Sequence, residues 1–482
     1  MVEQKKSIKS NYFYSLLQQA VTVTLPLVTV PYLSRVLGPE GIGIVAFTGS
    51  IIQYFILFGG LGLALYGNRA VARVRNNLEE RSKTFWEIFT LRATLTLAAF
   101  LFLTFFLILL RPLHSKVFFV QSILILNASL DISWLYMALE DFKKIAIRNM
   151  IIRLLGLVLV FLLIKRNEDF VKYAFIIVLT DLIGQAIYWV KIKDLVQKPC
   201  WSRLKWKRHI PSTIGLFVPE LAVQVYVVLD KTMLGLLVNI SEVALYSQPE
   251  KIIKALLRLI TTSGTVMLPR MSYLFSNSQE FEFFKYARKS LLFVSYGTFF
   301  FASLTFSLSN LFIPLFLGSS FLPSIKVFQA LSPLFVFIGI SNVLGIQLLI
   351  PMGKENLLSV SVIAGATTNF LGNLLLIPRY GAFGAAISSL CAELLVTAIQ
   401  WNFLRSSEFF KGAYWELGRF FVAASACIVT SLIIRLPQSP SWILIILCSF
   451  AQMIIYIVVL RLLHSETQTT LLSLFLRKRH IL

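Results

Sequence analysis

The stretch VALYSQPEKIIKALLRLITTSGTVML, residues 243–268, decides the fold class and supplies the first functional hypothesis. It has the length and apolar character of a membrane-spanning helix, which needs about 20 apolar residues. It nevertheless carries Glu250 together with three cations, Lys251, Lys254 and Arg258. The cations follow i, i+3, i+7 spacing and therefore share one helix face. Because a charge at bilayer depth costs roughly 2.5–3.5 kcal/mol to insert, the stretch predicts a membrane protein whose cations line a hydrated interior or bind an anion.

The composition of the whole chain agrees with a membrane protein. Hydrophobic residues make up 57% of the 482 positions and charged residues 14%, whereas soluble domains carry about 25% charged residues. The net charge of +22 would suit nucleic-acid binding if the basic residues formed one stripe. They fall instead in short segments between apolar runs, which is the pattern of membrane topology. The composition therefore disfavours nucleic acid as a partner.

Apolar runs long enough to span a bilayer occur fourteen times, so we expect an all-α polytopic membrane protein with about 14 transmembrane helices. Their approximate cores are residues 12–34, 42–66, 88–110, 117–138, 149–164, 173–190, 213–235, 243–268, 290–310, 327–350, 357–377, 382–404, 419–434 and 442–460. Of the 45 Lys and Arg, 30 lie on the side of the termini, 10 on the opposite side and 5 within spans. The excess predicts that both termini are cytoplasmic.

A weak internal repeat divides the chain after six spans. The exit Arg35-Val36-Leu37-Gly38 and the following Val45-Ala46-Phe47 resemble Lys231-Thr232-Met233-Leu234-Gly235 and the following Val243-Ala244-Leu245-Tyr246. Transporters built from parallel halves bind their substrate between the halves. We therefore expect one six-helix bundle with a basic inner linker at residues 1–200, a second bundle at 201–412, and helices 13 and 14 with a cytoplasmic tail at 413–482.

Charged residues in or beside the spans form the candidate sites. Arg35 and Lys231 occupy corresponding outer ends of the first and seventh spans, where binding and interfacial anchoring are both open. Glu250 can pair with Lys254 at i, i+4 spacing. Acids that could carry protons, bind Na⁺ or balance cations are Asp131, Asp181, Glu220 and Glu393.

Two inner linkers, residues 67–87 and 191–212, are rich in Lys and Arg. They either bind anionic lipid headgroups or only fix the topology. The four histidines (His114, His209, His464 and His480) all fall in or near loops. They suggest neither a metal site nor a His–carboxylate pair. Because every outer connection is short, an enzyme such as a lipid-linked glycan polymerase is disfavoured.

Several segments resemble the Wzx-type flippases, in the polysaccharide-transport branch of the MOP exporter superfamily. They are PYLSRVLGPEGIG at 31–43, DISWLY at 131–136, LEDFKK at 139–144, LDKTMLG at 229–235 and IPRYGAFGAA at 377–386. The resemblance implies a MATE-like pair of six-helix bundles plus two C-terminal helices. It also implies a flippase that moves undecaprenyl-diphosphate-linked oligosaccharide repeat units across the bacterial cytoplasmic membrane, for O-antigen, capsule or exopolysaccharide synthesis. Its matched positions are Arg35, Asp131, Asp230 and Lys231, and it suggests a polysaccharide polymerase and chain-length proteins as partners.

We therefore expect a transporter rather than an enzyme, working by alternating access through a cationic central cavity. The expected substrate-binding residues are Arg35, Lys231, Lys251, Lys254 and Arg258. The expected ion-coupling or charge-balancing residues are Asp131, Asp181, Glu220, Asp230, Glu250 and Glu393. No cofactor or metal is expected, although coupling to a Na⁺ or H⁺ gradient is open. Two alternatives remain: a multidrug or organic-cation exporter of the MATE type, and a peptidoglycan lipid II flippase.

Overall fold

The computed structural model describes the backbone of residues 8–201, 204–405, 412–433 and 441–470. Within these ranges it describes side chains from residue 24 onward, except those of residues 216, 218–220, 222–223, 225, 259, 262–263 and 265–266. All regular structure in these ranges is helical. The α-helices are α1 (Ile8–Gly60), α2 (Leu63–Arg73), α3 (Leu78–Leu110), α4 (Ser115–Leu130), α5 (Ser133–Ala138), α6 (Phe142–Leu163), α7 (Phe170–Trp189), α8 (Ile210–Leu237), α9 (Ile240–Ser276), α10 (Glu280–Leu317), α11 (Ser324–Leu331), α12 (Leu334–Asn342), α13 (Glu355–Leu404), α14 (Ala413–Ile433) and α15 (Trp442–Leu462). Short 3₁₀ turns lie at Asn167–Asp169, Ile192–Asp194, Trp206–His209 and Ser319–Phe321, and a π-helix at Val343–Leu349.

The prediction of an all-α polytopic membrane protein is confirmed. Ten helical stretches in the described ranges are long and apolar enough to cross a membrane. One of them, Glu355–Leu404, contains the predicted eleventh and twelfth spans, and Thr24–Arg73 contains the second span and the later part of the first. The predicted seventh and eighth spans lie in α8 and α9.

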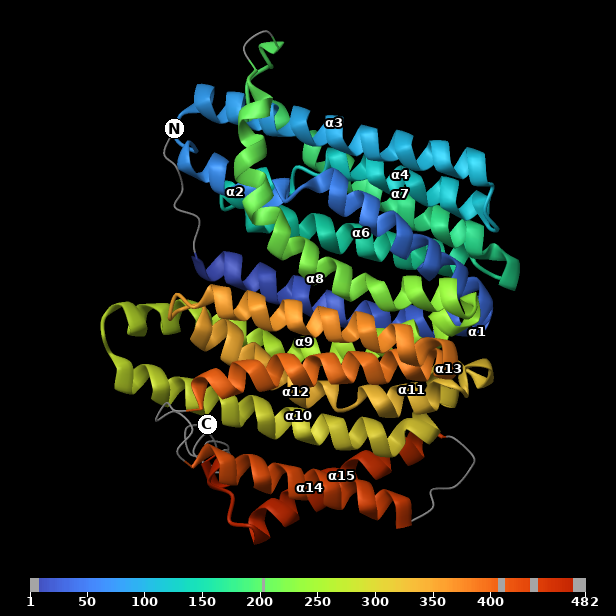
Figure 1. Ribbon diagram of the computed structural model, residues 1–482, viewed down its shortest axis with the longest axis vertical. Helices are drawn as coiled ribbons and strands as arrows, with labels where there is room; N and C mark the ends of the chain where they lie inside the picture. Colours follow the sequence, from blue (N-terminus) through green and yellow to red (C-terminus); the bar gives the residue numbers. More distant parts are fainter. Residues whose placement is uncertain (1–7, 202–203, 406–411, 434–440, 471–482) are drawn as a thin grey trace. The chain divides into compact units, whose positions relative to one another are not determined.

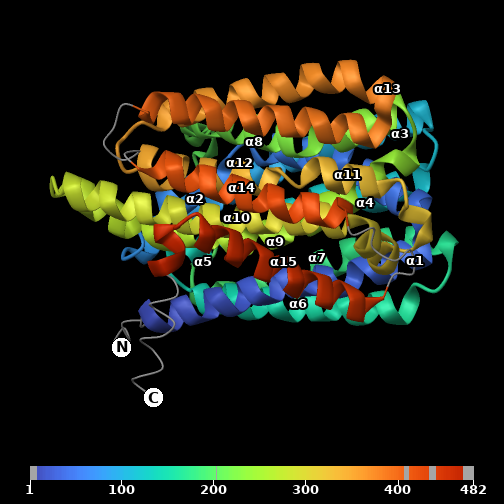
Figure 2. The same cartoon turned by 90° about the horizontal axis from the view of Figure 1, so that it is seen from below.

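Two glycines allow single helical stretches to serve as two spans. The backbone leaves helical geometry at Gly38 (φ 65°, ψ −178°) and at Gly381 (φ 55°, ψ −133°). A positive φ is strained for residues with a Cβ atom but is open to glycine. The two arms of α1 run in opposite directions from this point (Figure 1), and so do the two arms of α13 (Figure 2). The first chain reversal is therefore made at Gly38, inside the turn that the sequence predicts.

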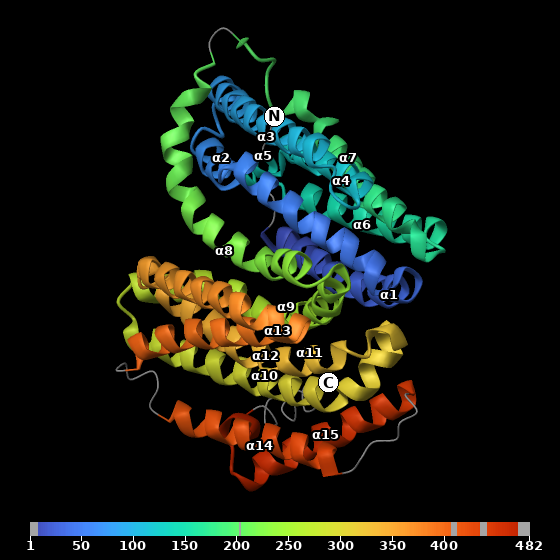
Figure 3. The same cartoon turned by 45° about the vertical axis from the view of Figure 1, so that its right-hand side comes forward.

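The chain forms two compact units, residues 1–244 and 245–482. In the first, α4 packs against α1, α3 and α7, while α8 packs against α1. Figure 3 shows α8 as a curved helix. The first unit thus includes α8. The division into two six-helix bundles, with its boundary in the sequence after residue 200, stays a prediction.

The contact between α8 and the second arm of α1 is close. A Cβ atom on Gly235 would lie 2.1 Å from Cδ2 of Phe47. The hydroxyls of Ser50 and Thr232 are hydrogen-bonded at 2.9 Å. Small residues at helix contacts permit such close approach in membranes, and this fit explains why α8 belongs to the first unit.

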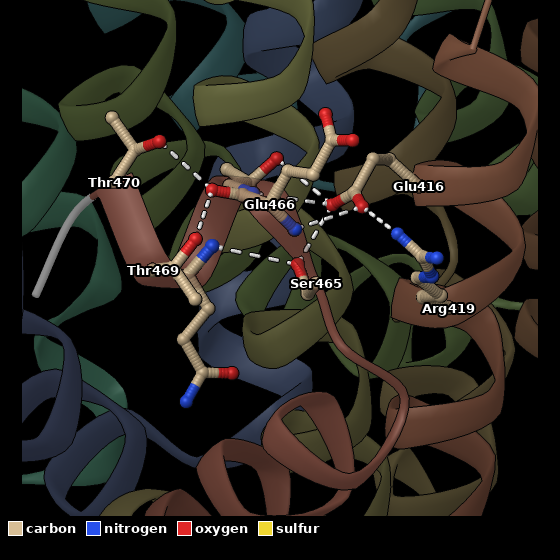
Figure 4. Close-up of polar contacts among 8 residues, drawn as sticks. Glu416, Arg419, Ser465, Glu466, Thr469 and Thr470 are labelled. Carbon is tan, nitrogen blue, oxygen red and sulfur yellow. Dashed lines mark hydrogen bonds and ion pairs between the residues drawn. The ribbon is translucent and has the colours of Figure 1, made fainter.

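In the second unit, α10 packs against α12 and α14, and α14 packs against α15. The turn after α15 is fixed by Glu416 of α14, which is buried. Its carboxylate accepts the Ser465 hydroxyl at 2.7 Å and the Glu466 backbone N–H at 3.1 Å, and pairs with Arg419 one turn along α14 (Figure 4). A carboxylate at the start of a short helical segment satisfies N–H groups that have no partner within the helix.

Candidate functional site

Helix α9 separates its apolar and cationic residues onto different sides. Ile252, Ile253 and Leu257 are buried in the second unit, whereas Lys251 and Arg258 are exposed. Helix α9 holds the predicted eighth span, although it is not one of the ten apolar stretches found among the described residues. In a membrane span, an exposed cationic side facing hydrocarbon would be costly. The arrangement is suited to a hydrated surface or an anionic ligand.

Glu250 and Lys254 form the ion pair that their spacing predicts. Nζ of Lys254 lies 2.5 Å from Oε1 of Glu250. The Glu250 side chain is buried, but 39% of the Lys254 side chain is exposed. Lys254 can therefore keep its counter-ion while more than a third of its side chain stays accessible to a ligand.

A row of neutral polar groups joins α9 to both arms of α13. Tyr246, one turn before Glu250, shares a hydrogen bond of 3.0 Å with the Ser389 hydroxyl. Ser389 also accepts Asn369 Nδ2 at 3.3 Å, and Asn369 accepts Asn373 Nδ2 at 3.1 Å. Glu393 is half-buried one turn beyond Ser389. The second unit thus contains a cationic surface and, on the same helix, a buried polar layer.

In the first unit, Asp131 is held by several neighbours at the break between α4 and α5. Its carboxylate accepts the Ser133 backbone N–H at 2.9 Å and lies 3.5 Å from Nη2 of Arg92. Arg92 also donates to the Asp131 backbone carbonyl at 3.0 Å, and only 8% of its side chain is exposed. This geometry balances the charge of Asp131 and shapes the helix break.

Asp181 lies on α7 in a second polar group of the first unit. It accepts Gln185 Nε2 at 3.2 Å. One turn away, Nε of Arg148 donates to the Gly184 carbonyl at 2.9 Å, and its guanidinium stands 5.0 Å from the centre of the Tyr188 ring. A Cβ atom on Gly184 would lie 2.2 Å from Nη2 of Arg148. The glycine therefore makes room for the arginine.

The other predicted residues lie in the first unit, apart from Glu220, whose side chain is outside the described residues. Arg35 is exposed on the first arm of α1, Asp230 is buried on α8, and Lys231 is half-buried beside it. The predicted residues thus divide between the units. The first holds Arg35, Asp131, Asp181, Asp230 and Lys231, and the second holds Glu250, Lys251, Lys254, Arg258 and Glu393.

A His–carboxylate pair that the sequence did not suggest lies at the end of the long basic linker. Nε2 of His209 is 2.9 Å from Oε2 of Glu87, and Nδ1 is 2.7 Å from the Tyr66 hydroxyl. Arg208 Nη2 lies 2.6 Å from the same carboxylate oxygen, and the Lys205 backbone N–H donates to the other oxygen at 2.8 Å. We call these five residues the Glu87 cluster.

The Glu87 cluster joins α2, α3 and the start of α8. Its Glu87 side chain has no exposed surface. Burial lowers the pKa of His209, although its hydrogen bond to Glu87 opposes this shift. A neutral imidazole with its proton on Nε2 donates to Glu87 and accepts from Tyr66, so both partners are satisfied. Since Glu87 and His209 are 122 residues apart, no local sequence pattern indicates the pair.

Within the described part of the chain, no three His, Cys, Asp or Glu side chains come together as metal ligands would. The polar groups are instead ion pairs, hydrogen-bonded rows and exposed cations. This set can bind anions and hydroxyls, or move a proton or a monovalent cation.

Residues 8–275 match the protein family described as "Polysaccharide biosynthesis protein". The chain is also similar to the "Putative O-antigen transporter" of Escherichia coli (strain K12), with 25% identity over 414 residues, covering 85% of this chain and 99% of the relative.

Two solved structures share the fold. "Lipid II flippase MurJ, inward closed conformation" superposes with a TM-score of 0.75 at 14% identity, over 96% of this chain and 99% of MurJ. An inward-facing multidrug resistance MATE family transporter of the MOP superfamily superposes with a TM-score of 0.55 at 15% identity, over 82% of this chain and 96% of that one. At these identities the likeness concerns the fold alone.

Proposed function

Because this chain belongs to the polysaccharide biosynthesis protein family, we propose that it is a flippase for undecaprenyl-diphosphate-linked oligosaccharide repeat units. The relative named as an O-antigen transporter and the flippase and transporter folds support a transporter rather than an enzyme. The products served would be O-antigen, capsule or exopolysaccharide. A polysaccharide polymerase and chain-length proteins would receive the repeat units.

The cationic side of α9 is the observation that carries this proposal. A lipid-linked repeat unit has an anionic diphosphate, a hydroxyl-rich sugar and a polyprenyl tail that is stable in hydrocarbon. Only the head needs a polar path, and it loses water when it enters that path. Exposed Lys251 and Arg258, with half-exposed Lys254, offer charge-assisted hydrogen bonds that replace this water.

The transport cycle would expose the cationic side of α9 alternately to the two faces of the membrane. Arg35 and Lys231 would assist the diphosphate as further cations of the path. The protein would lie in the bacterial cytoplasmic membrane, and the excess of Lys and Arg on one side supports an orientation with both termini cytoplasmic.

We further propose that an acid couples transport to a Na⁺ or H⁺ gradient. Asp131, Asp181, Glu220, Asp230, Glu250 and Glu393 are the candidates, with charge balance as their other role. Asp181 and Glu393 lie near the middle of α7 and of the second arm of α13, so they are the first to test. Asp181→Asn or Glu393→Gln should abolish gradient dependence in a folded protein. Unchanged gradient dependence in both variants would remove these two residues from the coupling role.

The flippase proposal is tested with purified protein in liposomes that contain an undecaprenyl-diphosphate oligosaccharide. A membrane-impermeant reagent reports how much headgroup changes leaflet, with and without imposed ion gradients. We expect protein-dependent movement that is lost in Lys254→Ala/Arg258→Ala. The matched control is Lys285→Ala/Lys289→Ala, which removes two cations from α10 and should keep transport.

Two further substrates distinguish the alternatives. Lipid II is included because the fold resembles MurJ, and a lipophilic organic cation is included because it also resembles a MATE transporter. Movement of lipid II but not the oligosaccharide would replace the proposed substrate. Export of the organic cation without movement of either lipid would replace the flippase proposal with a drug exporter.

A further inference from the structure

The long linker between α7 and α8 is fixed on the surface of α3. Arg81 Nε donates to the Leu195 carbonyl at 3.0 Å, and the Gln197 backbone N–H donates to the Ser82 hydroxyl at 2.8 Å. The Trp86 indole N–H donates to the Gln197 carbonyl at 2.8 Å. The Glu87 cluster fixes the far end through Lys205 and His209. Side chains of α3 thus bind the linker backbone at Leu195, Gln197 and Lys205, within the described linker residues 191–201 and 204–209.

The outward side of this linker is basic. Its exposed cations, apart from Arg208 of the Glu87 cluster, are Lys191, Lys193, Lys198, Lys205 and Lys207 among the described residues. Asp194 is the single acid between positions 190 and 209. Because α3 orders the backbone, these lysines occupy a defined surface, and little backbone entropy is lost when they bind a partner.

Tryptophans border the same surface. The Trp86 ring centre lies 6.3 Å from that of Trp189 at the end of α7 and 6.0 Å from that of Trp201 in the linker. Trp201 is 63% exposed. Tryptophan is enriched at the level of the lipid headgroups, where the ring meets apolar groups and the indole N–H finds a polar partner. Trp86 and Trp189 donate this N–H to the carbonyls of Gln197 and Leu130. The rings therefore place the neighbouring ammonium groups at headgroup depth.

We propose that linker residues 191–201 and 204–208, with Trp86 and Trp189, form a platform that binds the anionic phosphate headgroups of acidic phospholipids. The lysines supply the charge, and the tryptophans supply contact with the glycerol and upper acyl region. A soluble polyanion would use the charge but not the tryptophans. This binding is separate from substrate transport and does not require α9.

The test compares lipid binding by the full-length protein and two charge-matched variants. Detergent-purified protein is mixed with equal amounts of phosphatidylglycerol and phosphatidylcholine, and bound lipids are counted by native mass spectrometry. The platform variant is Lys193→Ala/Lys198→Ala/Lys207→Ala. The control variant, Lys285→Ala/Lys289→Ala/Lys354→Ala, removes three exposed cations from the second unit.

We expect the unchanged protein to prefer phosphatidylglycerol and the platform variant to lose about tenfold or more of this preference, because each basic residue near an anionic surface contributes measurably. The control variant should keep it. Equal loss in both variants, or no preference in the unchanged protein, would overturn the proposal.

A second arm separates a lipid headgroup from a free phosphate. Inorganic phosphate added at matched ionic strength should leave phosphatidylglycerol bound, since phosphate lacks the acyl region that the tryptophans contact. Trp201→Ser should weaken binding of both lipids but leave the headgroup preference intact. Displacement by inorganic phosphate together with no effect of Trp201→Ser would overturn the lipid platform and indicate a simple anion site.

Discussion

Glu87 of α3 is fully buried, and three donors from residues 205–209 of the linker meet its carboxylate. In α9, by contrast, Lys251 and Arg258 are exposed on a helix whose other side packs apolar residues into the second unit. Both sets of charge are unfavourable in hydrocarbon when considered alone. The charge of Glu87 is compensated by groups of the protein itself, so we expect its removal to lower the free energy of unfolding. The exposed cations of α9 can be compensated by water or by a bound anion, so we expect their removal to weaken ligand binding.

Removal of the Glu87 carboxylate should give the largest loss of stability. Glu87→Ala leaves His209 and Arg208 without their shared acceptor. Leaving a buried donor without its acceptor costs about 1–3 kcal/mol, and Glu87→Ala does so for both His209 Nε2 and the Lys205 backbone N–H. Thermal and denaturant unfolding of the purified protein would measure the effect. Glu80→Ala, an exposed acid in the first turn of α3, is the control, and a similar loss there would contradict the comparison.

Filling the space that Gly184 leaves for Arg148 should give the next largest loss of stability. Gly184→Ala puts the new Cβ atom against Nη2 of Arg148. The guanidinium must then shift away from the Gly184 carbonyl and the Tyr188 ring, and the loss of such a hydrogen bond costs about 1 kcal/mol. The control is Gly156→Ala on α6, where the new Cβ meets only Thr180 Cγ2, at an ordinary 3.7 Å. We expect lower unfolding temperature in the first variant only. Equal behaviour of the two would show that Arg148 moves without cost.

Acid pH should weaken the Glu87 cluster by a smaller amount. Burial lowers the pKa of His209, whereas the unfolded chain binds a proton near pH 6.5. The unfolded state therefore binds more protons between the folded and unfolded pKa values. Stability should fall as the pH drops below about 6.5 and level off below the folded pKa. His209→Gln should reduce this part of the pH dependence of the unfolding temperature, and a pH profile identical to that of the unchanged protein would exclude His209 as its source.

Lys251→Ala should have the smallest effect on stability. The Lys251 side chain is exposed, and an exposed cation contributes about 0–1 kcal/mol. Transport of the lipid-linked oligosaccharide should nevertheless decrease strongly, because the ammonium group lies on the proposed path. An unfolding temperature lowered as far as in Glu87→Ala would place Lys251 among the structural charges instead.

The spans and their breaks follow from local sequence. Lipid excludes unpaired backbone groups, so each crossing needs its own apolar run. Glycine at positions 38 and 381 allows the reversals that the structure makes there. The i, i+4 spacing of Glu250 and Lys254 likewise predicts their contact, because both lie on one helix. The assignment of these residues to substrate binding and coupling stays a prediction.

Other features depend on contacts between distant segments, which periodicity does not report. Glu87 and His209 meet because the linker runs along α3. The four histidines appear in the sequence only as loop residues. One local feature of the sequence indicates the Glu87 cluster: Glu87 directly precedes the apolar run 88–110. An acid buried beside such a run requires polar partners.

The attachment of Glu416 to the turn at Ser465 also has a consequence for the order of events during biosynthesis. Its partners Ser465, Glu466 and Thr467 are translated 49 to 51 residues later. At 5–20 residues per second this takes roughly 3 to 10 s. Arg419, only three residues after Glu416, is available almost at once. Arg419 can therefore neutralise the Glu416 carboxylate before α15 is synthesised. The contacts of Glu416 with the turn after α15 form only once residues 465–467 have been translated.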